Sequence, residues 1–376
     1  MINITYVYAG NRKVKFENKN FDSRDFFYGL TFFDNKNFNL NIIEPIENNS
    51  MAGKALSFID MFFKKVLNLP VYTREFLNIN NIKTLLKSDK IILVNETTFC
   101  SLAPLLLFLK LFKNIEVYVF VMGLYSKKLR FPYLEKLHFL IIKIFILTST
   151  NILFLGKGEF DKANLTHKSI SSKFILFPFY IDFRFWNSKY NIDIKERNKI
   201  LFVGNDGNRD YKLFLEIVKI LKNYQFVAIT NNPLILNNKL PNLELPNKNK
   251  TYLSDKELKN YYLNCKFVIL PLKNSFQPSG QSVSLQTMAS KRAVLLSYTD
   301  GFWDQTSFIN NEDIKFIFKN NVSSWVSTIK EVYNDQNFLT GLEKKGYENV
   351  KYNLNMDIFR KKLFELLNIN NFTDTW

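Results

Sequence analysis

The chain has 376 residues, which is long enough for two domains that each bury a core of their own. Hydrophobic residues make up 47% and charged residues 23% of the chain, and this composition excludes general disorder. The two cysteines and two histidines stand in no metal-ligand spacing, which excludes a disulfide framework and a histidine-rich metal centre.

Basic residues outnumber acidic ones, and the net charge of +17 is unevenly distributed. Residues 101–180 hold 11 basic and 4 acidic side chains, together with the two most apolar segments, 103–112 and 137–147. Neither segment reaches the roughly 18–20 uninterrupted apolar residues of a membrane-spanning helix. Two interpretations are open here: a pair of buried helices with solvated lysines, or a basic, amphipathic surface that docks on anionic lipid.

The first half of the chain alternates apolar, β-rich runs with segments of helical spacing. Its first ten residues, MINITYVYAG, are typical of a strand and not of a signal peptide, so we expect a cytoplasmic protein. The alternation predicts a parallel sheet with helices on both faces. We expect strands at 2–9, 38–43, 90–94, 116–122 and 151–155, and helices at 22–33, 98–112 and 133–147.

The same alternation repeats after a polar stretch at 187–198, which predicts a second parallel sheet. We therefore expect an α/β protein of two Rossmann-like, doubly wound domains, 1–190 and 191–355, with a last helix in 356–376 that packs back on the first domain. Ligands of such folds bind in the cleft at the carboxyl ends of the strands. The predicted strands are 199–203, 226–230, 243–245, 267–270 and 293–297, and the helices are 210–223, 255–264, 282–290 and 322–333.

The segment LFVGNDGNRDY, residues 201–211, combines a strand end, a glycine-containing loop and a helix start near Asp210. Gly204 and Gly207 permit close backbone approach, and a helix N-terminus attracts anions. Arg209 is placed to reach a phosphate there. The alternative is a tight turn between strand and helix with Arg209 in solvent.

A second segment, PLKNSFQPSGQSVSLQTMASKRAVLLS, residues 271–297, has the same design. Ser279 and Ser282 are good N-cap residues on either side of Gly280, so free amides converge at a predicted anion site. Gln286 lies one turn further along the same helix face and would meet a ribose or sugar hydroxyl. The alternative is an ordinary buried strand-loop-helix unit.

These segments carry a resemblance to a known family. ILFVGNDGNRDYKLFLEIVKIL, YLSDKELKNYYLNCKFVILPL and PSGQSVSLQTMASKRAVLLS, in this order, resemble the donor domain of retaining glycosyltransferases of the GT-B fold, particularly the GT4-like group. The match covers roughly residues 199–310, and the first half matches mainly by rhythm. The resemblance implies two Rossmann-like domains that face a central cleft.

The resemblance also implies the site residues, with Arg209 and Gln281 in catalytic positions. The acceptor would meet the loops of the first domain at Gly10, Asn11, Glu96 and Gly123. We expect no cofactor and no metal, because no loop carries a DxD-type acidic pair. The donor would be held by Gly204, Asn205, Arg209, Ser279, Gly280, Gln281, Ser282 and Gln286.

The chain departs from the family pattern at several positions. The family has two glutamates spaced E-x7-E, and here Gln286 takes the second position and Pro278 the first. The usual histidine of the first domain is also missing. Two alternatives are therefore kept: a catalytically silent relative that binds a glycan or partner, and a sugar-nucleotide epimerase, whose acidic and histidine residues are scarce here.

The expected activity is transfer of a sugar from a nucleoside-diphosphate donor to a glycan or lipid-linked acceptor, as in bacterial surface polysaccharide or lipopolysaccharide synthesis. The expected location is the cytoplasm, with peripheral attachment through residues 101–180 to the inner face of an anionic membrane. An inverting enzyme would need a base, for which Glu96, Asp22 and Asp25 are candidates; helix capping is the alternative for all three. No nucleic-acid motif accompanies the basic charge, so we expect no nucleic-acid partner.

Overall fold

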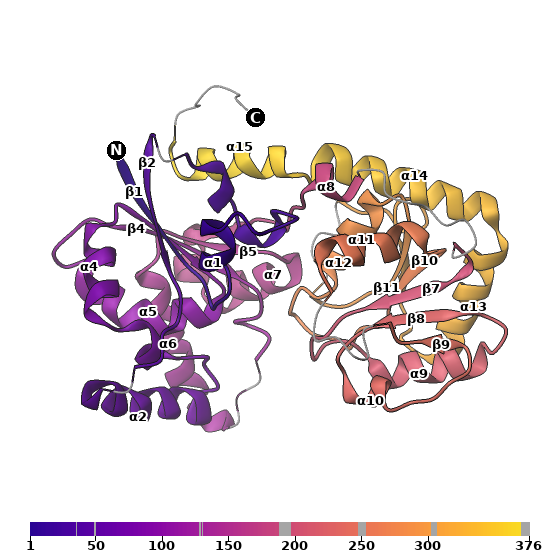
Figure 1. The fold of residues 1–376 in the computed structure, drawn as a ribbon. Coiled ribbons are helices and arrows are strands. Elements are labelled where there is room, and N and C mark those ends of the chain that lie inside the picture. Colours follow the sequence, from indigo (N-terminus) through magenta and orange to yellow (C-terminus); the bar gives the residue numbers. More distant parts are fainter. Residues whose placement is uncertain are drawn as a thin grey trace. The chain divides into compact units, whose positions relative to one another are not determined.

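The computed structural model describes residues 1–34, 36–48, 50–127, 129, 131–187, 197–246, 253–301 and 307–369. The chain forms two compact units, each around a parallel sheet of six strands, so the predicted α/β class is confirmed (Figure 1). The predicted domain boundary at 190–191 lies outside the described residues. Unit 1 comprises Met1–Phe21, Phe27–Pro178 and Phe276–Pro278, and unit 2 comprises Asp22–Phe26, Phe179–Ser275 and Ser279–Trp376.

The sheet of unit 1 has the strand order β2-β1-β3-β4-β5-β6, and every neighbouring pair is parallel. Its central strands are mostly apolar because helices cover both faces, and β3 is buried along its whole length, whereas the edge strand β2 is FNLNII and only partly buried. The strands are β1 (Ile2–Val7), β2 (Phe38–Ile43), β3 (Lys90–Val94), β4 (Glu116–Val121), β5 (Asn151–Phe154) and β6 (Phe174–Leu176).

The helices of unit 1 differ from the prediction in two ways: one expected helix does not form, and the α-helices at 13–17, 51–66, 73–76, 79–87 and 157–166 were not predicted. The predicted helix 22–33 is wrong: two short 3-10 turns, η1 (Asp25–Phe27) and η2 (Leu30–Phe32), replace it. Tyr28 and Gly29 between them have φ values of 48° and 88°, which no right-handed helix accommodates. The α-helices are α1 (Lys13–Glu17), α2 (Met51–Val66), α3 (Thr73–Phe76), α4 (Ile79–Lys87), α5 (Glu96–Leu109), α6 (Glu135–Leu147) and α7 (Lys157–Thr166), with further 3-10 turns η3 (Pro132–Leu134) and η4 (Lys168–Lys173).

The sheet of unit 2 has the order β12-β11-β10-β7-β8-β9, again parallel throughout. Helices α11 (Asp255–Asn264) and α12 (Gln281–Ala289) lie on one side of this sheet and α9 (Tyr211–Ile220) on the other (Figure 1). The strands are β7 (Ile200–Val203), β8 (Phe226–Ile229), β9 (Leu243–Glu244), β10 (Phe267–Leu270), β11 (Ala293–Ser297) and β12 (Lys315–Ile317).

Several helices of unit 2 begin at side-chain caps that the sequence supplies. Asp210 caps α9 by accepting from the Leu213 amide, and Ser254 and Glu257 form a capping box at the start of α11. The helices are α8 (Phe183–Asn187), α9 (Tyr211–Ile220), α10 (Pro233–Leu236), α11 (Asp255–Asn264), α12 (Gln281–Ala289), α13 (Val322–Asn334), α14 (Gln336–Asn353) and α15 (Met356–Leu366).

The predicted terminal helix forms as α15. Within unit 2 it contacts the segment before α8, through a β-bridge between Ile181 and Asn355 and a ring contact between Tyr180 and Phe359. Its packing on the first domain stays a prediction.

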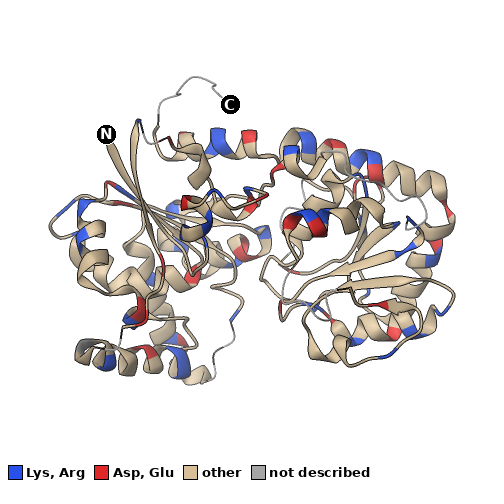
Figure 2. Cartoon of the chain, in the orientation of Figure 1, with Lys and Arg blue, Asp and Glu red and all other residues tan. Residues whose placement is uncertain are grey.

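Lys and Arg residues occur on helices of both units (Figure 2). In the part of the chain that the structure describes, no helix is both long and apolar enough to cross a membrane. The same residues contain no group of His, Cys, Asp or Glu that could hold a metal ion.

Candidate functional site

The candidate site of unit 2 begins with its sheet topology. Strand β7 lies between β8 and β10, so the chain leaves β7 on one side and returns to its other side. Loops that follow β7 and β10 therefore emerge together at the carboxyl edge, where ligands of doubly wound sheets bind. The two segments singled out in the sequence are these two loops.

Polar contacts join the two loops directly. The Asn208 side-chain amide donates to Ser279 Oγ at 2.8 Å, and the Lys273 amide donates to the Asn208 carbonyl at 2.8 Å. The Asp210 amide donates to the Pro271 carbonyl at 2.9 Å. The loop after β7 is thus fixed against the loop after β10 before any ligand is considered.

Arg209 lies inside this pair of loops and is only 3% exposed, so the alternative that placed it in solvent is wrong. Its Nε donates to the Val203 carbonyl at 3.1 Å, and its Nη1 lies 3.0 Å from Asp206 Oδ2. Nη1 is nevertheless buried and makes no properly directed hydrogen bond to any residue that the structure describes. A buried guanidinium with a donor to spare fits an anionic oxygen.

Gly204 is the residue that makes room for this guanidinium. Its φ is 152°, and a Cβ at this position would collide with Arg209 Nε and Cζ. Asn205 and Asp206 shape the rest of the loop, because Asn205 Oδ1 accepts from the Asn231 amide and Asp206 Oδ1 from the Asn208 amide. The glycine and the polar residues after it therefore hold Arg209 at the edge of the sheet.

The second loop ends at α12, which begins at Gln281, one residue before the predicted start of the helix. Its N-cap is Gly280, with φ of 83°, so the predicted capping roles of Ser279 and Ser282 are wrong. Ser279 accepts from Asn208 instead, and Ser282 lies in the first helical turn. The first amides of a helix have no acceptor within it, and its positive end favours an anion.

Gln286 is buried in α12, and both ends of its side chain have protein partners. Its Nε2 donates to Asp25 Oδ2 at 2.9 Å, and its Oε1 accepts from the Tyr262 hydroxyl at 3.2 Å. The structure thus shows a polar network where the sequence suggested a sugar contact. A contact between Gln286 and the donor stays a prediction.

Asp25 is the acceptor at the centre of this network, and its helix-capping interpretation is wrong because the predicted helix does not form. It is 2% exposed and accepts from the Asp182 amide at 2.6 Å and from Trp186 Nε1 at 2.8 Å, in addition to Gln286. Burial raises the pKa of Asp25 to about 7, although these three hydrogen bonds favour the charged form. No feature of the sequence linked Asp25 to α12.

In unit 1 the predicted acceptor residues follow neighbouring strands. Gly10 and Asn11 follow β1, Glu96 follows β3, and Gly123 follows β4, and these strands are adjacent in the sheet. Glu96 Oε2 accepts from the Met122 amide at 3.3 Å. Gly123 has φ of 145°, and a Cβ there would press on the side chains of Ser126 and Gln277. The structure thus brings the four residues to one edge.

Sequence reasoning missed a buried carboxyl at this edge. Glu159, near the start of α7, accepts from the Tyr125 amide at 2.9 Å through Oε1, while Oε2 has no partner among the described residues. Burial raises the pKa of Glu159 to about 8. Nearby, a cavity of about 410 Å³ is lined by Leu124, Tyr125, Lys127, Leu129, Pro132, Glu135, His138, Phe139, Ile142, Lys162, Thr166 and His167.

The two histidines lie in the wall of that cavity. His167 Nδ1 is 2.9 Å from the Tyr125 hydroxyl, and its ring stacks on Phe139 at 4.3 Å. Burial lowers the pKa of His138 and of His167, which favours neutral rings at neutral pH. Neither histidine could be placed from the sequence, because no motif surrounds them.

No family model matches the chain, and no curated protein matches it in sequence. Solved structures do match over nearly its whole length. A sucrose-phosphate synthase from Thermosynechococcus elongatus is 12% identical, covers 98% of both chains and has a TM-score of 0.66. Alr3699/HepE from Anabaena, solved in complex with UDP and glucose, is 6% identical, with 98% of this chain and 100% of that chain covered and a TM-score of 0.65.

A glycosyltransferase from Rickettsia africae is 11% identical, covers 97% of both chains and has a TM-score of 0.63. At these identities the likeness establishes the architecture. Two parallel, doubly wound units and these matches together show that the chain has the GT-B fold.

Proposed function

We propose that the protein is a glycosyltransferase that moves a sugar from a nucleoside-diphosphate donor to a glycan or lipid-linked acceptor. The observation that carries the proposal is the buried Arg209 at the carboxyl edge of unit 2, whose Nη1 lies 3.0 Å from Asp206 Oδ2 but makes no properly directed hydrogen bond within the described part of the chain. HepE, which shares the fold, was solved with UDP-glucose. The position of Arg209 at the β7–β10 edge supports an anionic ligand there.

The donor diphosphate in this proposal lies between the two loops of unit 2. Arg209 and the first amides of α12, at Gln281 and Ser282, face its oxygens, and the glycines at 204 and 280 allow the backbone to approach. Asn205, Ser279 and Gln286 complete the proposed donor set. This arrangement uses one side-chain cation and oriented backbone dipoles, which suits a diphosphate better than a neutral sugar.

The same groups supply the proposed catalysis. Cleavage of the sugar–phosphate bond leaves negative charge on the departing diphosphate, and Arg209 with the α12 amides would stabilise that charge. The loss of one such donor typically costs about 10²–10³ in rate. We propose a retaining reaction without a metal, in which Gln281 and Arg209 contact the reacting group.

The acceptor is proposed to bind at the carboxyl edge of unit 1, where Gly10, Asn11, Glu96 and Gly123 gather. We place the protein at the cytoplasmic face of an anionic membrane, with a role in surface polysaccharide or lipopolysaccharide synthesis. The basic excess in residues 101–180 and the apolar side chains that unit 1 exposes support this location.

A panel of UDP, GDP, ADP, CDP and dTDP in a thermal-unfolding assay tests the donor site. A ligand at a hundred times its dissociation constant adds about 2.7 kcal/mol to the free energy of unfolding. We expect one diphosphate to raise the midpoint of the wild-type protein and to lose this effect in Arg209→Ala. Arg184→Ala, which removes an exposed arginine of the same unit, is the matched control and should keep the shift. The absence of a shift with all five would overturn the proposal.

A catalytically silent relative is the second candidate. One observation favours it. Gln286 stands where the GT4-like pattern has a glutamate, and both its Oε1 and its Nε2 are hydrogen-bonded within the protein. Such a protein would bind a nucleotide sugar and release no nucleoside diphosphate from it, whereas a transferase releases the diphosphate slowly even without acceptor.

A further inference from the structure

Helix α2 of unit 1 exposes several large apolar side chains on one face. Phe58 is 69% exposed and Phe62 47%, and Ile59 and Met61 are exposed beside them. Soluble surfaces tolerate single exposed apolar residues, but a contiguous apolar helix face marks an interaction site. The face is formed because Phe58 and Phe62 are one helical turn apart.

The opposite face of α2 fixes the helix to unit 1. Asp60 is buried and accepts from the Thr73 amide at 2.8 Å and the Arg74 amide at 3.1 Å. The Phe63 ring packs on Phe145 of α6, with centroids 6.2 Å apart. The exposed phenylalanines are therefore held outward by a helix that is anchored on its other side.

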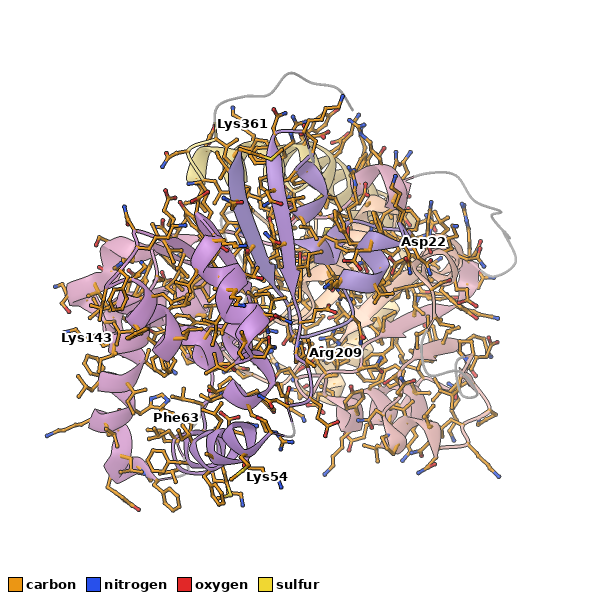
Figure 3. The ribbon with its side chains drawn as sticks, turned by 60° about the vertical axis from the view of Figure 1, so that its left-hand side comes forward. Asp22, Lys54, Phe63, Lys143, Arg209 and Lys361 are labelled. Atoms are coloured by element: carbon orange, nitrogen blue, oxygen red, sulfur yellow. The ribbon has the colours of Figure 1, made fainter. Side chains whose placement is uncertain are left out.

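Two lysines share the exposed face of α2 with the apolar side chains, because Lys54 and Lys65 lie one helical turn before and after them. Lys54 and Lys65 are exposed, and Asp60, the only acidic residue of the helix, faces the interior. Figure 3 shows Phe63 and Lys54 on opposite sides of α2. The outward side thus combines aromatic side chains with positive charge and no negative charge, the composition of helices that lie in the headgroup region of anionic bilayers.

We propose that α2 is the membrane-docking helix of this protein, with Phe58, Ile59 and Phe62 inserted among the lipids and Lys54 and Lys65 at the phosphates. The proposal rests on the membrane location in the proposed function, and it moves the principal contact outside residues 101–180. A second copy is a poorer occupant, because two such faces would bring lysines together in a chain whose net charge is +17.

Flotation with vesicles of phosphatidylcholine, with and without phosphatidylglycerol, tests the proposal. We expect the wild-type protein to float with the anionic vesicles. Phe58→Ala with Phe62→Ala should weaken that binding at least about tenfold, since each change removes most of the apolar area of one phenylalanine from the bilayer. Lys54→Glu with Lys65→Glu should weaken it only where phosphatidylglycerol is present.

The matched control is the pair Phe108→Ala and Phe112→Ala, two exposed phenylalanines in the last turn of α5 and just after it, whose rings are 5.0 Å apart. This pair should keep most of the binding. Equal flotation of the wild-type protein and the α2 pair would overturn the proposal, as would a loss confined to the α5 pair. A concentration-dependent dimer that the α2 pair abolishes, without any flotation, would overturn it in favour of self-association.

A nucleotide-binding measurement on the same variants distinguishes a failure of membrane docking from a failure of the proposed transferase activity. The α2 pair should keep the thermal shift given by the nucleoside diphosphate, which also shows that the variant is folded. A protein that binds nucleotide and does not float contradicts membrane docking alone, whereas one that floats and binds no nucleotide contradicts the transferase proposal alone.

Discussion

At the scale of single residues, the candidate donor site depends on a close fit between a glycine and an arginine. Gly204 leaves the space that the guanidinium of Arg209 fills, and Arg209 in turn bonds the carbonyl of the last residue of β7. The sequence predicts that both residues matter, but it leaves open whether Arg209 lies in solvent. Burial of Arg209 matters because a buried cation without a counter-charge or hydrogen-bond acceptor costs more free energy than a solvated one.

Gly204→Ala should therefore displace Arg209 and weaken nucleotide binding. The φ of 152° and the collision of a Cβ with the guanidinium both act against the native loop, and we expect a loss of about 1–3 kcal/mol in the free energy of unfolding. Gly207→Ala is the matched control, because nothing lies within 4 Å of the position that a Cβ would take there and its φ is not in the left-handed region. Urea unfolding and nucleotide titration of both variants check the prediction, which equal behaviour would contradict.

The buried Asp25 leads to a second prediction, on how the free energy of unfolding depends on pH. Its pKa is raised from 3.8 to about 7, so the folded protein holds a proton that the unfolded chain releases. The free energy of unfolding should therefore fall as pH rises from about 4 through about 7, by up to about 1.4 kcal/mol per pH unit. Asp25→Asn should lose this slope, as urea unfolding at several pH values would show.

Glu159 also has a raised pKa and lowers the free energy of unfolding as pH rises. The difference between the wild-type protein and Asp25→Asn therefore isolates the contribution of Asp25. Parallel curves for the two proteins would contradict the assignment. Asparagine has one acceptor oxygen, which at the Oδ2 position keeps the contacts with Trp186 and Gln286 and loses the one with the Asp182 amide. That loss does not titrate, so it lowers the free energy of unfolding at every pH and leaves the slope as the readout.

At the scale of elements, most strands were predicted because their signal is local, whereas the short strands β6 and β12 were missed. A run such as KIILV at β3 is buried at every position, which is typical of a parallel strand covered on both faces. The predicted helix at 22–33 failed because Tyr28 and Gly29 take positive φ values that apolar spacing does not reveal. Helix α2 was missed because its apolar residues lie on two faces of the helix, one packed against the rest of unit 1 and one exposed, so they do not form a single apolar stripe.

The candidate site was predicted only in part for a related reason. The two loops were found because glycines and polar residues after a strand are visible in the sequence. Their connection through Asn208 and Ser279, and the link from Asp25 to Gln286, join residues 71 and 261 positions apart. Contacts at that separation depend on the fold, and no pattern in one sequence contains them.

The link between the two loops gives an element-scale prediction. Asn208→Ala removes the hydrogen bond to Ser279 Oγ, which is worth about 1 kcal/mol, so nucleotide affinity should fall about fivefold. Ser254→Ala is the control for a polar change in the same unit: it removes the capping box of α11 and should lower the free energy of unfolding by about 1 kcal/mol without changing affinity. Calorimetric titration measures both, and unchanged affinity in Asn208→Ala would contradict the proposed role of the link.

At the scale of the whole molecule, the two units share a plan and differ in their surfaces. Each sheet has a strand, β1 or β7, with parallel neighbours on both sides, and in each unit the candidate residues follow that strand and the next ones. Unit 1 adds exposed phenylalanines on α2 and at the end of α5, together with the basic excess of residues 101–180. The proposed donor chemistry of unit 2 and the proposed lipid contact of unit 1 are thus separate hypotheses, which separate experiments address.

Turnover of a sugar nucleotide is the measurement that tests the central claim most directly. Nucleoside-diphosphate release would be followed for a panel of sugar nucleotides, with and without bacterial membranes as acceptor, in the wild-type protein and in Arg209→Ala. We predict release from one donor, stimulated by acceptor and reduced about 10²–10³-fold in the variant, with thermal unfolding used to show that the variant is folded. Binding of a sugar nucleotide without any release, or release at the wild-type rate from folded Arg209→Ala, would contradict the account.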